Sequence, residues 1–477
     1  MIRMYHATMD SGLKIVLDRT ANTSLAEQIS IGISGAIASG VLAPGARLPS
    51  WLDLAAQLGV ARGTVKTAYE RLADAQLIVS SRPAGTRVAG QPVKRAVKEQ
   101  RSIETDLQSD LYQHFVPGPA VFQMGVPASD CFPVALFGRI RARAARDEVE
   151  APAFYHDPRG EHELRREIAA HLALSRGIEC RPSQIFITAG FSGALGATLQ
   201  ALRAEGRAAW VENPGFLPTR RALQISRLST VPIPVDEEGI DVAHGEARAP
   251  DAALALVTPG QQAPLGPTLS LARRLRLLDW ARRAHAWIIE DDYLGELQLK
   301  RRAAPALAAQ DRSGRVIHIG SFSKTISPTL RLGFVVAPLS LVARFDDVMA
   351  CLAPAPGPAV QTATTEFMRD GHYLRHLRRM KRVYAARSSA LLANLEAEGL
   401  HGYAAGLAVV LQLPDGADDK AIAREAYAYG MAPAPLSVWY GAPGTARSGL
   451  LLGVATAIEA QQATACRRLG QLIQRFS

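Results

Sequence analysis

The sequence contains few cysteines and no long apolar run. Its four cysteines, Cys131, Cys180, Cys351 and Cys466, lie far apart and form no Cys-x-x-Cys pair. This spacing predicts no metal site and no disulfide framework, and it suits a reducing compartment. The longest apolar stretches, such as residues 333–343, reach about half of the roughly 20 residues that a membrane span needs. We therefore expect a cytoplasmic protein with no membrane partner, and the mixed polar start of the chain predicts no signal peptide.

Charge is unevenly distributed along the chain. Of the 477 residues, 48% are hydrophobic and 21% are charged, which excludes a disordered, collagen-like or coiled-coil chain as the overall class. The net charge is +10, and residues 1–95, with eleven Lys/Arg and six Asp/Glu, carry +5 of it. A small basic end on a nearly balanced body indicates an anionic partner for that end, with a solvated basic surface as the alternative.

The segment from residue 24 to residue 88 has the pattern of a winged helix-turn-helix. Apolar residues from Leu25 to Ile37 recur every four positions, which gives one helix an apolar stripe. Ser50 and Asp53 have capping-box spacing at the start of a short helix, and Gly59 supplies the following turn. The remaining predicted elements are a helix over residues 62–75 and short strands over residues 77–81 and 86–89.

Five side chains of this segment are candidates for contact with DNA. A recognition helix reads base edges in the major groove with its first-turn side chains. Those are Arg62 and Thr64 here, with Lys66 further along, and the wing between the strands offers Arg82 and Thr86 to phosphates or the minor groove. An amphipathic helical module that binds a protein is the alternative.

The motifs of this segment resemble the GntR-type winged helix. They are Gly-x-Leu-x-Pro-Gly, Leu-Pro-Ser, Leu-Ala-x-x-Leu-Gly-Val, Thr-Val-x-x-Ala-Tyr and a Gly-Thr wing. The resemblance implies double-stranded operator DNA as a partner. Two segments depart from the family pattern: Trp51-Leu52 replaces a usual Ser-Arg, and Ala61 replaces a Ser at the recognition turn. Without a side-chain N-cap at Ala61 the helix loses about 1 kcal/mol, and we expect an unusual sequence preference.

From about residue 119 short apolar runs alternate with amphipathic helices. Such runs, covered by helices on both faces, are typical of a mostly parallel sheet. From about residue 350 the pattern predicts a small C-terminal α+β subdomain. The predicted strands cover residues 185–188, 208–212, 253–258, 287–290, 316–319 and 332–337.

Three motifs at the carboxyl ends of these strands supply the groups that pyridoxal phosphate needs. The cofactor requires a lysine for its aldehyde, an acid for its pyridine nitrogen and donors for its phosphate. Lys324 follows one strand, and Asp291 and Tyr293 close another. The Gly-rich turn with Phe191 and Ser192 lies between a strand and a helix. Each motif alone is weak, but together they predict this cofactor.

The sequence around these motifs resembles fold-type I aminotransferases, and together with the winged helix it resembles the MocR subfamily of GntR regulators. The matching text includes ITAGFSGAL, WVENPGF, WIIEDDYLGEL and IGSFSKTISPTLRLGFVVAP. The resemblance implies an α/β fold with a winged helix over residues 13–89, a linker over residues 90–117 and an aminotransferase-like domain over residues 118–477. It also implies a homodimer whose cofactor sites lie at the subunit interface.

The resemblance assigns a role to each candidate residue. Lys324 forms the Schiff base, Asp291 faces the ring nitrogen, and Tyr293 donates to the phenolic oxygen. The remaining assignments are Ser321, Ser323, Arg331 and the amides of Phe191 and Ser192 for the phosphate, Phe216 for stacking on the ring, and Arg447 for an effector carboxylate.

One departure bears on whether the chain is an enzyme. True aminotransferases place Asn before Pro-x-Gly, whereas this chain has Ala263, and Gln261 replaces a frequent His of the family. We therefore expect a pyridoxal phosphate-dependent transcription regulator with little or no turnover, which senses a small amine or the cofactor itself. The alternatives are an aminotransferase with an appended winged helix and a cofactor-free interaction protein.

Overall fold

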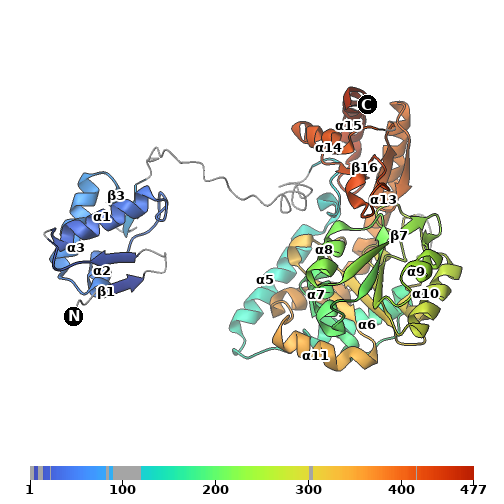
Figure 1. Cartoon of the computed structure of the whole chain (residues 1–477), viewed down its shortest axis with the longest axis horizontal. Coiled ribbons are helices and arrows are strands. Elements are labelled where there is room, and N and C mark those ends of the chain that lie inside the picture. Colours follow the sequence, from blue (N-terminus) through green and yellow to red (C-terminus); the bar gives the residue numbers. More distant parts are fainter. Residues whose placement is uncertain are drawn as a thin grey trace. The chain divides into compact units, whose positions relative to one another are not determined.

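The chain forms two compact units, Met1–Glu104 and Thr105–Ser477 (Figure 1). The structure is a computed structural model. It describes residues 5–8, 14–21, 23–81, 85–89, 120–299, 305–414 and 416–476. The predicted linker, residues 90–117, lies outside the described residues.

The first unit is a winged helix-turn-helix, as the sequence predicts. Strands β3 and β4 pair antiparallel to form the wing. A further antiparallel pair, β1 and β2, was not predicted, because two four-residue strands leave little periodicity to detect. The elements are β1 (Tyr5–Thr8), β2 (Lys14–Leu17), α1 (Leu25–Ala38), α2 (Trp51–Leu58), α3 (Arg62–Asp74), β3 (Ile78–Ser81) and β4 (Gly85–Val88).

Apolar side chains from all three helices make the core of this unit. Ile29 and Ile33 of α1, Leu54 of α2, and Val65 and Leu72 of α3 are each at most 1% exposed. The four-residue spacing within α1 puts its isoleucines on one face, toward α3. The inward helix faces of the sequence prediction are therefore confirmed.

The second unit is built on an eight-stranded sheet in the order β5-β12-β11-β10-β9-β6-β7-β8. Strands β6, β7, β9, β10 and β11 run parallel, whereas β12 runs antiparallel to both β11 and β5. The strands are β5 (Ile185–Thr188), β6 (Ala208–Asn213), β7 (Ser229–Asp236), β8 (Gly239–Ile240), β9 (Leu254–Val257), β10 (Trp287–Asp291), β11 (Val316–Ser321) and β12 (Gly333–Val336).

Helices cover both faces of this sheet. Successive residues of a strand point to opposite faces, and Ile288 and Ile289 of β10 accordingly belong to two different buried clusters. Both residues are fully buried, which explains the continuous apolar runs of the sequence. The helices are α5 (Val134–Glu150), α6 (His162–Arg176), α7 (Gly190–Leu202), α8 (Leu217–Ile225), α9 (Val242–Arg248), α10 (Leu271–Arg283), α11 (Val342–Cys351) and α12 (Pro358–Arg369).

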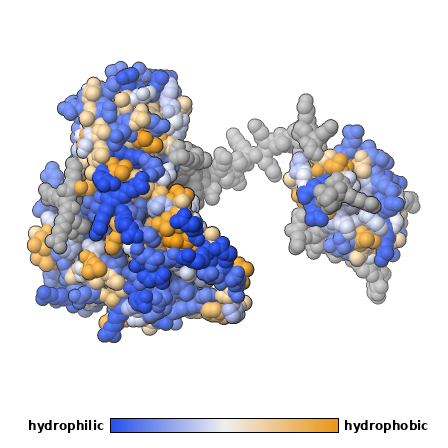
Figure 2. Space-filling model, turned by 180° about the vertical axis from the view of Figure 1, so that it is seen from behind, coloured by the Kyte–Doolittle hydropathy of each residue, from blue (hydrophilic) through white to orange (hydrophobic). Residues whose placement is uncertain are grey.

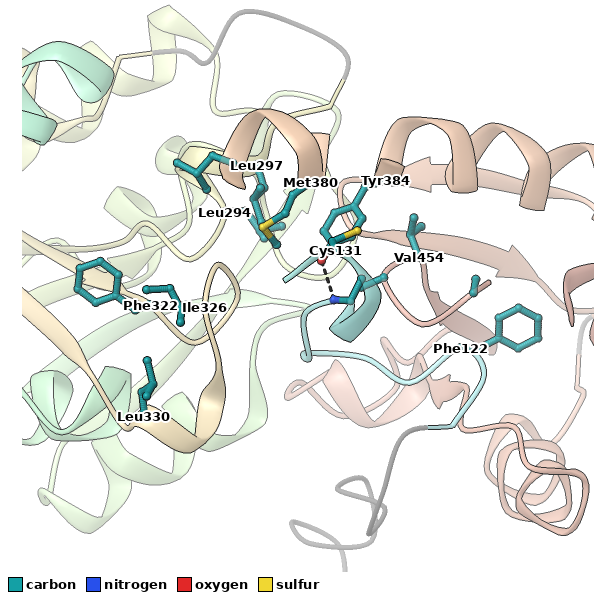
Figure 3. Close-up of a cluster of buried hydrophobic side chains, with 14 of the residues drawn as sticks. Phe122, Cys131, Leu294, Leu297, Phe322, Ile326, Leu330, Met380, Tyr384 and Val454 are labelled. Atoms are coloured by element: carbon teal, nitrogen blue, oxygen red, sulfur yellow. Dashed lines mark hydrogen bonds between the residues drawn. The ribbon is translucent and has the colours of Figure 1, made fainter. Parts of the chain in front are cut away.

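The C-terminal part is the predicted α+β subdomain, with an antiparallel sheet in the order β13-β14-β16-β15. One apolar cluster joins it to the large sheet (Figure 3). In that cluster Met380 and Tyr384 of α13 lie near Cys131, and the Ala128 amide donates to the Tyr384 hydroxyl at 2.8 Å. The elements are α13 (His372–Ala397), β13 (Gly402–Ala405), β14 (Ala408–Gln412), α14 (Asp419–Ala426), β15 (Ala434–Pro435), β16 (Gly449–Gly453) and α15 (Glu459–Phe476).

The visible surface of both units is mainly hydrophilic, with scattered hydrophobic areas (Figure 2). Single exposed apolar side chains are normal on protein surfaces. Among the described residues, no helix is both long and apolar enough to cross a membrane, and no cluster of His, Cys, Asp and Glu could hold a metal ion.

Candidate functional site

The start of α3 presents the predicted DNA-reading side chains to solvent. Arg62 and Lys66 are exposed, and Thr64 is half-buried. Lys66 forms an exposed ion pair with Glu70 at 3.7 Å, one helical turn along. Tyr69 on the other face is buried, and its hydroxyl donates to the Pro49 carbonyl at 2.9 Å, so it anchors the helix. The exposed side chains thus lie on a helix held from behind.

The N-termini of α2 and α3 are capped differently. At α2 the Ser50 hydroxyl accepts the Asp53 amide at 3.1 Å and donates to its carboxylate at 2.6 Å. Ala61 occupies the N-cap of α3 with extended backbone and no side-chain hydrogen bond. The expected loss of a cap at the recognition helix is therefore confirmed.

A basic residue that the sequence reasoning missed lies beside the wing. Arg82 lies outside the described residues, and the Thr86 hydroxyl is 2.9 Å from that of Ser80. Arg47, just before α2, is exposed, and its guanidinium Nε lies 3.5 Å from the position that a Cβ on Gly85 would take. Arg47 could have been found only by knowing that its segment pairs with β4, because nothing in its local sequence marks it.

Lys324 and Asp291 come together at the carboxyl edge of β10 and β11. These strands are parallel neighbours, so the residues that follow them lie side by side. Burial lowers the pKa of Lys324 to about 8, although the negative charge of Asp291 partly raises it again. The Lys324 ammonium donates to the Gly125 carbonyl at 2.6 Å. A lysine with a lowered pKa releases its proton more readily, and the neutral amine is the nucleophilic form.

The Asp291 carboxyl is buried and strongly perturbed. Burial, followed by the negative charges of Asp292 and Glu212, raises its pKa to about 8, and Lys324 opposes this rise. A positive group placed against Asp291 would relieve that cost, because an opposite charge favours the ionised form of a carboxyl group. A protonated pyridine nitrogen is such a group.

Glu212, at the end of β6, is a second buried carboxyl that the sequence reasoning missed. Its carboxylate accepts the Thr258 amide at 3.0 Å, the Thr258 hydroxyl at 2.5 Å and the Gln262 amide at 3.3 Å. Burial nevertheless raises its pKa to about 7. Its position within WVENPGF was the available signal, but a single acid in an apolar strand does not reveal its partners.

Tyr293, Phe216 and Phe191 surround the same edge. Tyr293 is half-buried, and burial together with the charges of Asp291 and Glu212 raises its pKa, so its hydroxyl stays protonated. The Phe216 and Phe191 ring centroids are 6.4 Å apart, and the Trp439 ring lies 5.7 Å from that of Phe216. The site therefore has an aromatic wall and a proton donor.

Hydroxyls, an arginine and a helix N-terminus gather beside Lys324. The Ser323 amide donates to the Ser321 hydroxyl at 3.2 Å. Arg331 is exposed, and a Cβ on Gly190, the first residue of α7, would lie 3.8 Å from its backbone. Phe191 and Ser192 form the first turn of α7, where unpaired amides attract anions. This group matches what a phosphate needs.

Arg447 lies apart from this group in the described contacts. It is exposed, just before β16, and its charge acts on the hydroxyls of Tyr403 and Tyr440. No described contact joins it to Lys324 or Asp291. The other residues predicted for the second unit together supply the groups that pyridoxal phosphate needs. They are an amine, a buried carboxyl group that a cation would stabilise, a phenol, and hydroxyl and amide groups that can bind a phosphate.

Comparison with known families agrees with this division of the chain. The family model described as "Bacterial regulatory proteins, gntR family" matches residues 25–88. The family model described as "Aminotransferase class I and II" matches residues 135–432, more than half of the chain.

Regulators with both parts are similar to this chain over most of its length. The probable rhizopine catabolism regulatory protein MocR of Rhizobium meliloti is 33% identical, over 89% of this chain and 88% of that protein. The HTH-type pyridoxine biosynthesis transcriptional regulator PdxR of Corynebacterium glutamicum is 32% identical, over 93% of this chain and 95% of that protein.

Solved aminotransferases share the fold of the second unit. LysN, an alpha-aminoadipate aminotransferase from Thermus thermophilus, was solved with N-(5'-phosphopyridoxyl)-L-leucine. It is 26% identical with a TM-score of 0.69, over 78% of this chain and 96% of LysN. An archaeal alanine:glyoxylate aminotransferase is 24% identical with a TM-score of 0.69, over 77% of this chain and 94% of that one.

Proposed function

The chain belongs to the MocR-type transcription regulators of the GntR family, and from that premise we propose that an amine or the cofactor itself controls its binding to DNA. Membership makes it a DNA-binding regulator whose aminotransferase-like unit binds pyridoxal phosphate. The observation that carries the proposal is the Lys324–Asp291 pair, which a chain that only binds DNA would not need.

We assign the cofactor contacts as follows. Pyridoxal phosphate, when bound, supplies an aldehyde that reacts with amines and an electron-withdrawing ring. Lys324 presents its amine to the aldehyde, and Asp291 holds a proton on the ring nitrogen. The other contacts are Tyr293 to the phenolic oxygen, Phe216 to the ring face, and Ser321, Ser323, Arg331 and the amides of Phe191 and Ser192 to the phosphate.

We propose regulation rather than transamination as the main task of this site. Ala263 is buried where aminotransferases present an Asn amide, and its methyl group donates no hydrogen bond. The neighbouring Gln262 amide cannot replace it, because it donates to the Pro214 and Ala263 carbonyls at 2.7 and 2.6 Å. Steady formation of keto acid from many amino acids would favour the enzyme instead.

The recognition surface of the first unit is assigned to operator DNA. Arg62, Thr64 and Lys66 on α3 face the bases, and Thr86 with Arg47 faces the phosphates. Arg62 and Lys66 support this role by their exposure at the N-terminal end of the recognition helix. A contact between Arg82 of the wing and DNA remains a prediction.

We propose a homodimer formed through the second unit. Phe154 and Tyr155 are 64% and 104% exposed, so two large aromatic side chains lie in solvent, and the Phe154 ring stacks on that of His156 with 4.3 Å between the centroids. Exposed aromatic clusters are typical of protein interfaces. Tyr155→Ala should weaken self-association about 10-fold or more, whereas Leu174→Ala, at a site on α6 that is 89% exposed, should not. A cofactor-loaded wild type that sediments as a monomer at micromolar concentration would contradict the dimer.

Control of DNA binding by an effector can be tested because the coupling between two binding sites is reciprocal. An effector amine would release the Lys324 side chain. The carboxylate of the effector would bind Arg447, and this would change the conformation of the second unit and hence the affinity for DNA. Operator DNA must then change effector affinity by the same factor, typically about 5–150-fold. The test uses the full-length, cofactor-loaded protein and an operator selected from random DNA, and it follows the visible absorption during amine titrations.

The results of these titrations decide between the two candidate effectors. Equal amine affinity with and without operator excludes an amine effector. If removal of pyridoxal phosphate then changes operator affinity, the cofactor itself is the effector. If neither ligand changes operator affinity, the site does not regulate DNA binding.

A further inference from the structure

A cavity of about 250 Å³ lies in the second unit, between the loop that follows β9 and the elements of the C-terminal subdomain. None of the residues assigned to the cofactor lines it. The lining residues are Gly260, Gln261, Gly266, Thr268, Gln298, Leu299, Ala385, Ser388, Ser389, Leu392, Ala404 and Gly406.

Two buried polar side chains of this cavity have no hydrogen-bond partner among the described residues. Gln261 is 9% exposed and Ser388 is 5% exposed, so each is more than nine-tenths buried. The adjacent Gln262 shows the usual situation, because its amide is fully hydrogen-bonded within the protein. The polar atoms of Gln261 and Ser388 line the cavity instead, where water or a ligand can form hydrogen bonds with them.

Gln261 reaches across the boundary between the two parts of this unit. A Cβ on Gly406, in the turn after β13, would lie 1.7 Å from the Gln261 amide nitrogen. Only glycine therefore allows the amide to lie over this turn. The side chain is held between the loop after β9 and the small sheet, where its hydrogen-bonding groups border the cavity.

The lining carries amides and hydroxyls but no charge. All twelve lining residues are uncharged. An ion in this space would lose its hydration without gaining a counter-charge, which is costly. Gln261, Ser388 and the more exposed Ser389 offer both donors and acceptors, which matches the hydroxyl groups of a polyol.

The size of the cavity limits the ligand. Its volume is about 250 Å³. This volume is below the range of about 300–1,000 Å³ that drug-sized ligands occupy. We propose that the cavity is a second small-molecule site and that it binds a neutral polyol with a single six-membered ring.

The class of ligand is tested by calorimetric titration of the full-length, cofactor-loaded protein. The neutral probes are D-glucose, D-galactose and myo-inositol. The charged probes of the same size are D-glucuronate and, at mildly acidic pH, D-glucosamine. At least one neutral probe should bind with a Kd near or below about 1 mM, and the charged analogues of that probe should bind at least about 10-fold more weakly. Absence of binding by every neutral probe, or equal binding of charged analogues, overturns the proposal.

Variants locate the site. Ser389 is exposed at the edge of the cavity, so Ser389→Phe should block entry and abolish binding without disturbing the core, whereas Ala386→Phe, exposed on the same helix but not in the lining, should not. Gln261→Ala should weaken binding about 3–10-fold, the usual effect of losing a neutral hydrogen bond. Cofactor absorbance checks that each variant is folded. Unchanged affinity in Ser389→Phe places the polyol elsewhere and overturns the assignment.

Discussion

The two units use charged side chains in opposite ways. In the winged helix, Arg62 and Lys66 stand in solvent on a helix anchored from behind by Tyr69. In the aminotransferase-like unit, Asp291 and Glu212 are buried, and their pKa values rise to about 8 and about 7. The first arrangement keeps cations hydrated until a phosphate or base replaces the water. The second maintains a desolvated acid, which a bound positive group can stabilise.

This difference follows from the ligands. DNA is a large polyanion whose counterions are released on binding, so surface charge is sufficient to attract it. A small cofactor offers few contacts, and each must be strong, which requires a low-dielectric site with preorganised groups. Substitution of a buried charged residue should therefore have a larger effect than substitution of an exposed one.

The largest effect is expected for Lys324→Ala. The variant should lose the visible absorption band of the lysine-linked cofactor after dialysis, because no other described amine is placed beside Asp291. Removing the Lys324 charge should also raise the Asp291 pKa further above its value of about 8. Lys420→Ala, at an exposed position of α14, is the control and should keep the band. Retention of the band by the Lys324 variant would remove this lysine from its role.

Glu212→Gln should change the pH dependence of stability. The Glu212 pKa is raised from 4.5 to about 7 in the folded protein, so its contribution to stability is fully present below pH 4.5 and is lost as the pH rises through 7. The neutral variant lacks this loss. Its unfolding free energy relative to wild type should therefore increase between pH 4.5 and 7, by on the order of 3 kcal/mol.

The measurement is denaturant unfolding of the cofactor-free protein at several pH values. The constant penalty of placing an amide opposite Thr258 does not depend on pH, so the slope isolates the carboxyl group. Glu70→Gln, at an exposed ion pair of the winged helix, should leave the stability of its own unit unchanged within about 0.5 kcal/mol. Parallel curves for wild type and Glu212→Gln would mean that Glu212 is not perturbed.

The sequence predicted six strands of the large sheet and the order of the site motifs, because those features are local, but it did not name β7 and β8. The strand at residues 185–188 was predicted to the residue, and parallel neighbours then required Asp291 and Lys324 to meet at one edge. The antiparallel direction of β12 was not predicted, because the apolar residues of a strand do not indicate whether it runs parallel or antiparallel to its neighbours. Glu212, Gly125 and Arg47 were missed for a related reason. Each acts through a partner far away in the sequence, such as Thr258 for Glu212.

Arg62→Ala should weaken binding to the selected operator by about 1–3 kcal/mol and relax its base preference, because a first-turn arginine reads a guanine edge. Arg47→Ala should weaken binding to operator and random DNA alike and make the salt dependence shallower by about one counterion. Fluorescence anisotropy at several salt concentrations distinguishes the two. Equal losses on both DNAs for Arg62→Ala would show that Arg62 contacts only the backbone.

The smallest effect is expected at the cap of α3. Ala61 occupies the N-cap with φ −64° and ψ 142°, an extended conformation suited to a capping side chain, yet it makes no side-chain hydrogen bond. Ala61→Thr supplies a hydroxyl that can accept an amide of the first turn, worth about 1 kcal/mol. In a domain of this size that gain corresponds to roughly 4–8 °C in the melting temperature of the winged helix. Ala61→Val has the same shape without the acceptor and should show no such gain. If valine stabilises the unit as much as threonine, the gain comes from packing. In that case apolar contacts stabilise the start of α3, and the difference between a solvent-exposed polar surface in the first unit and buried charges in the second does not extend to this position.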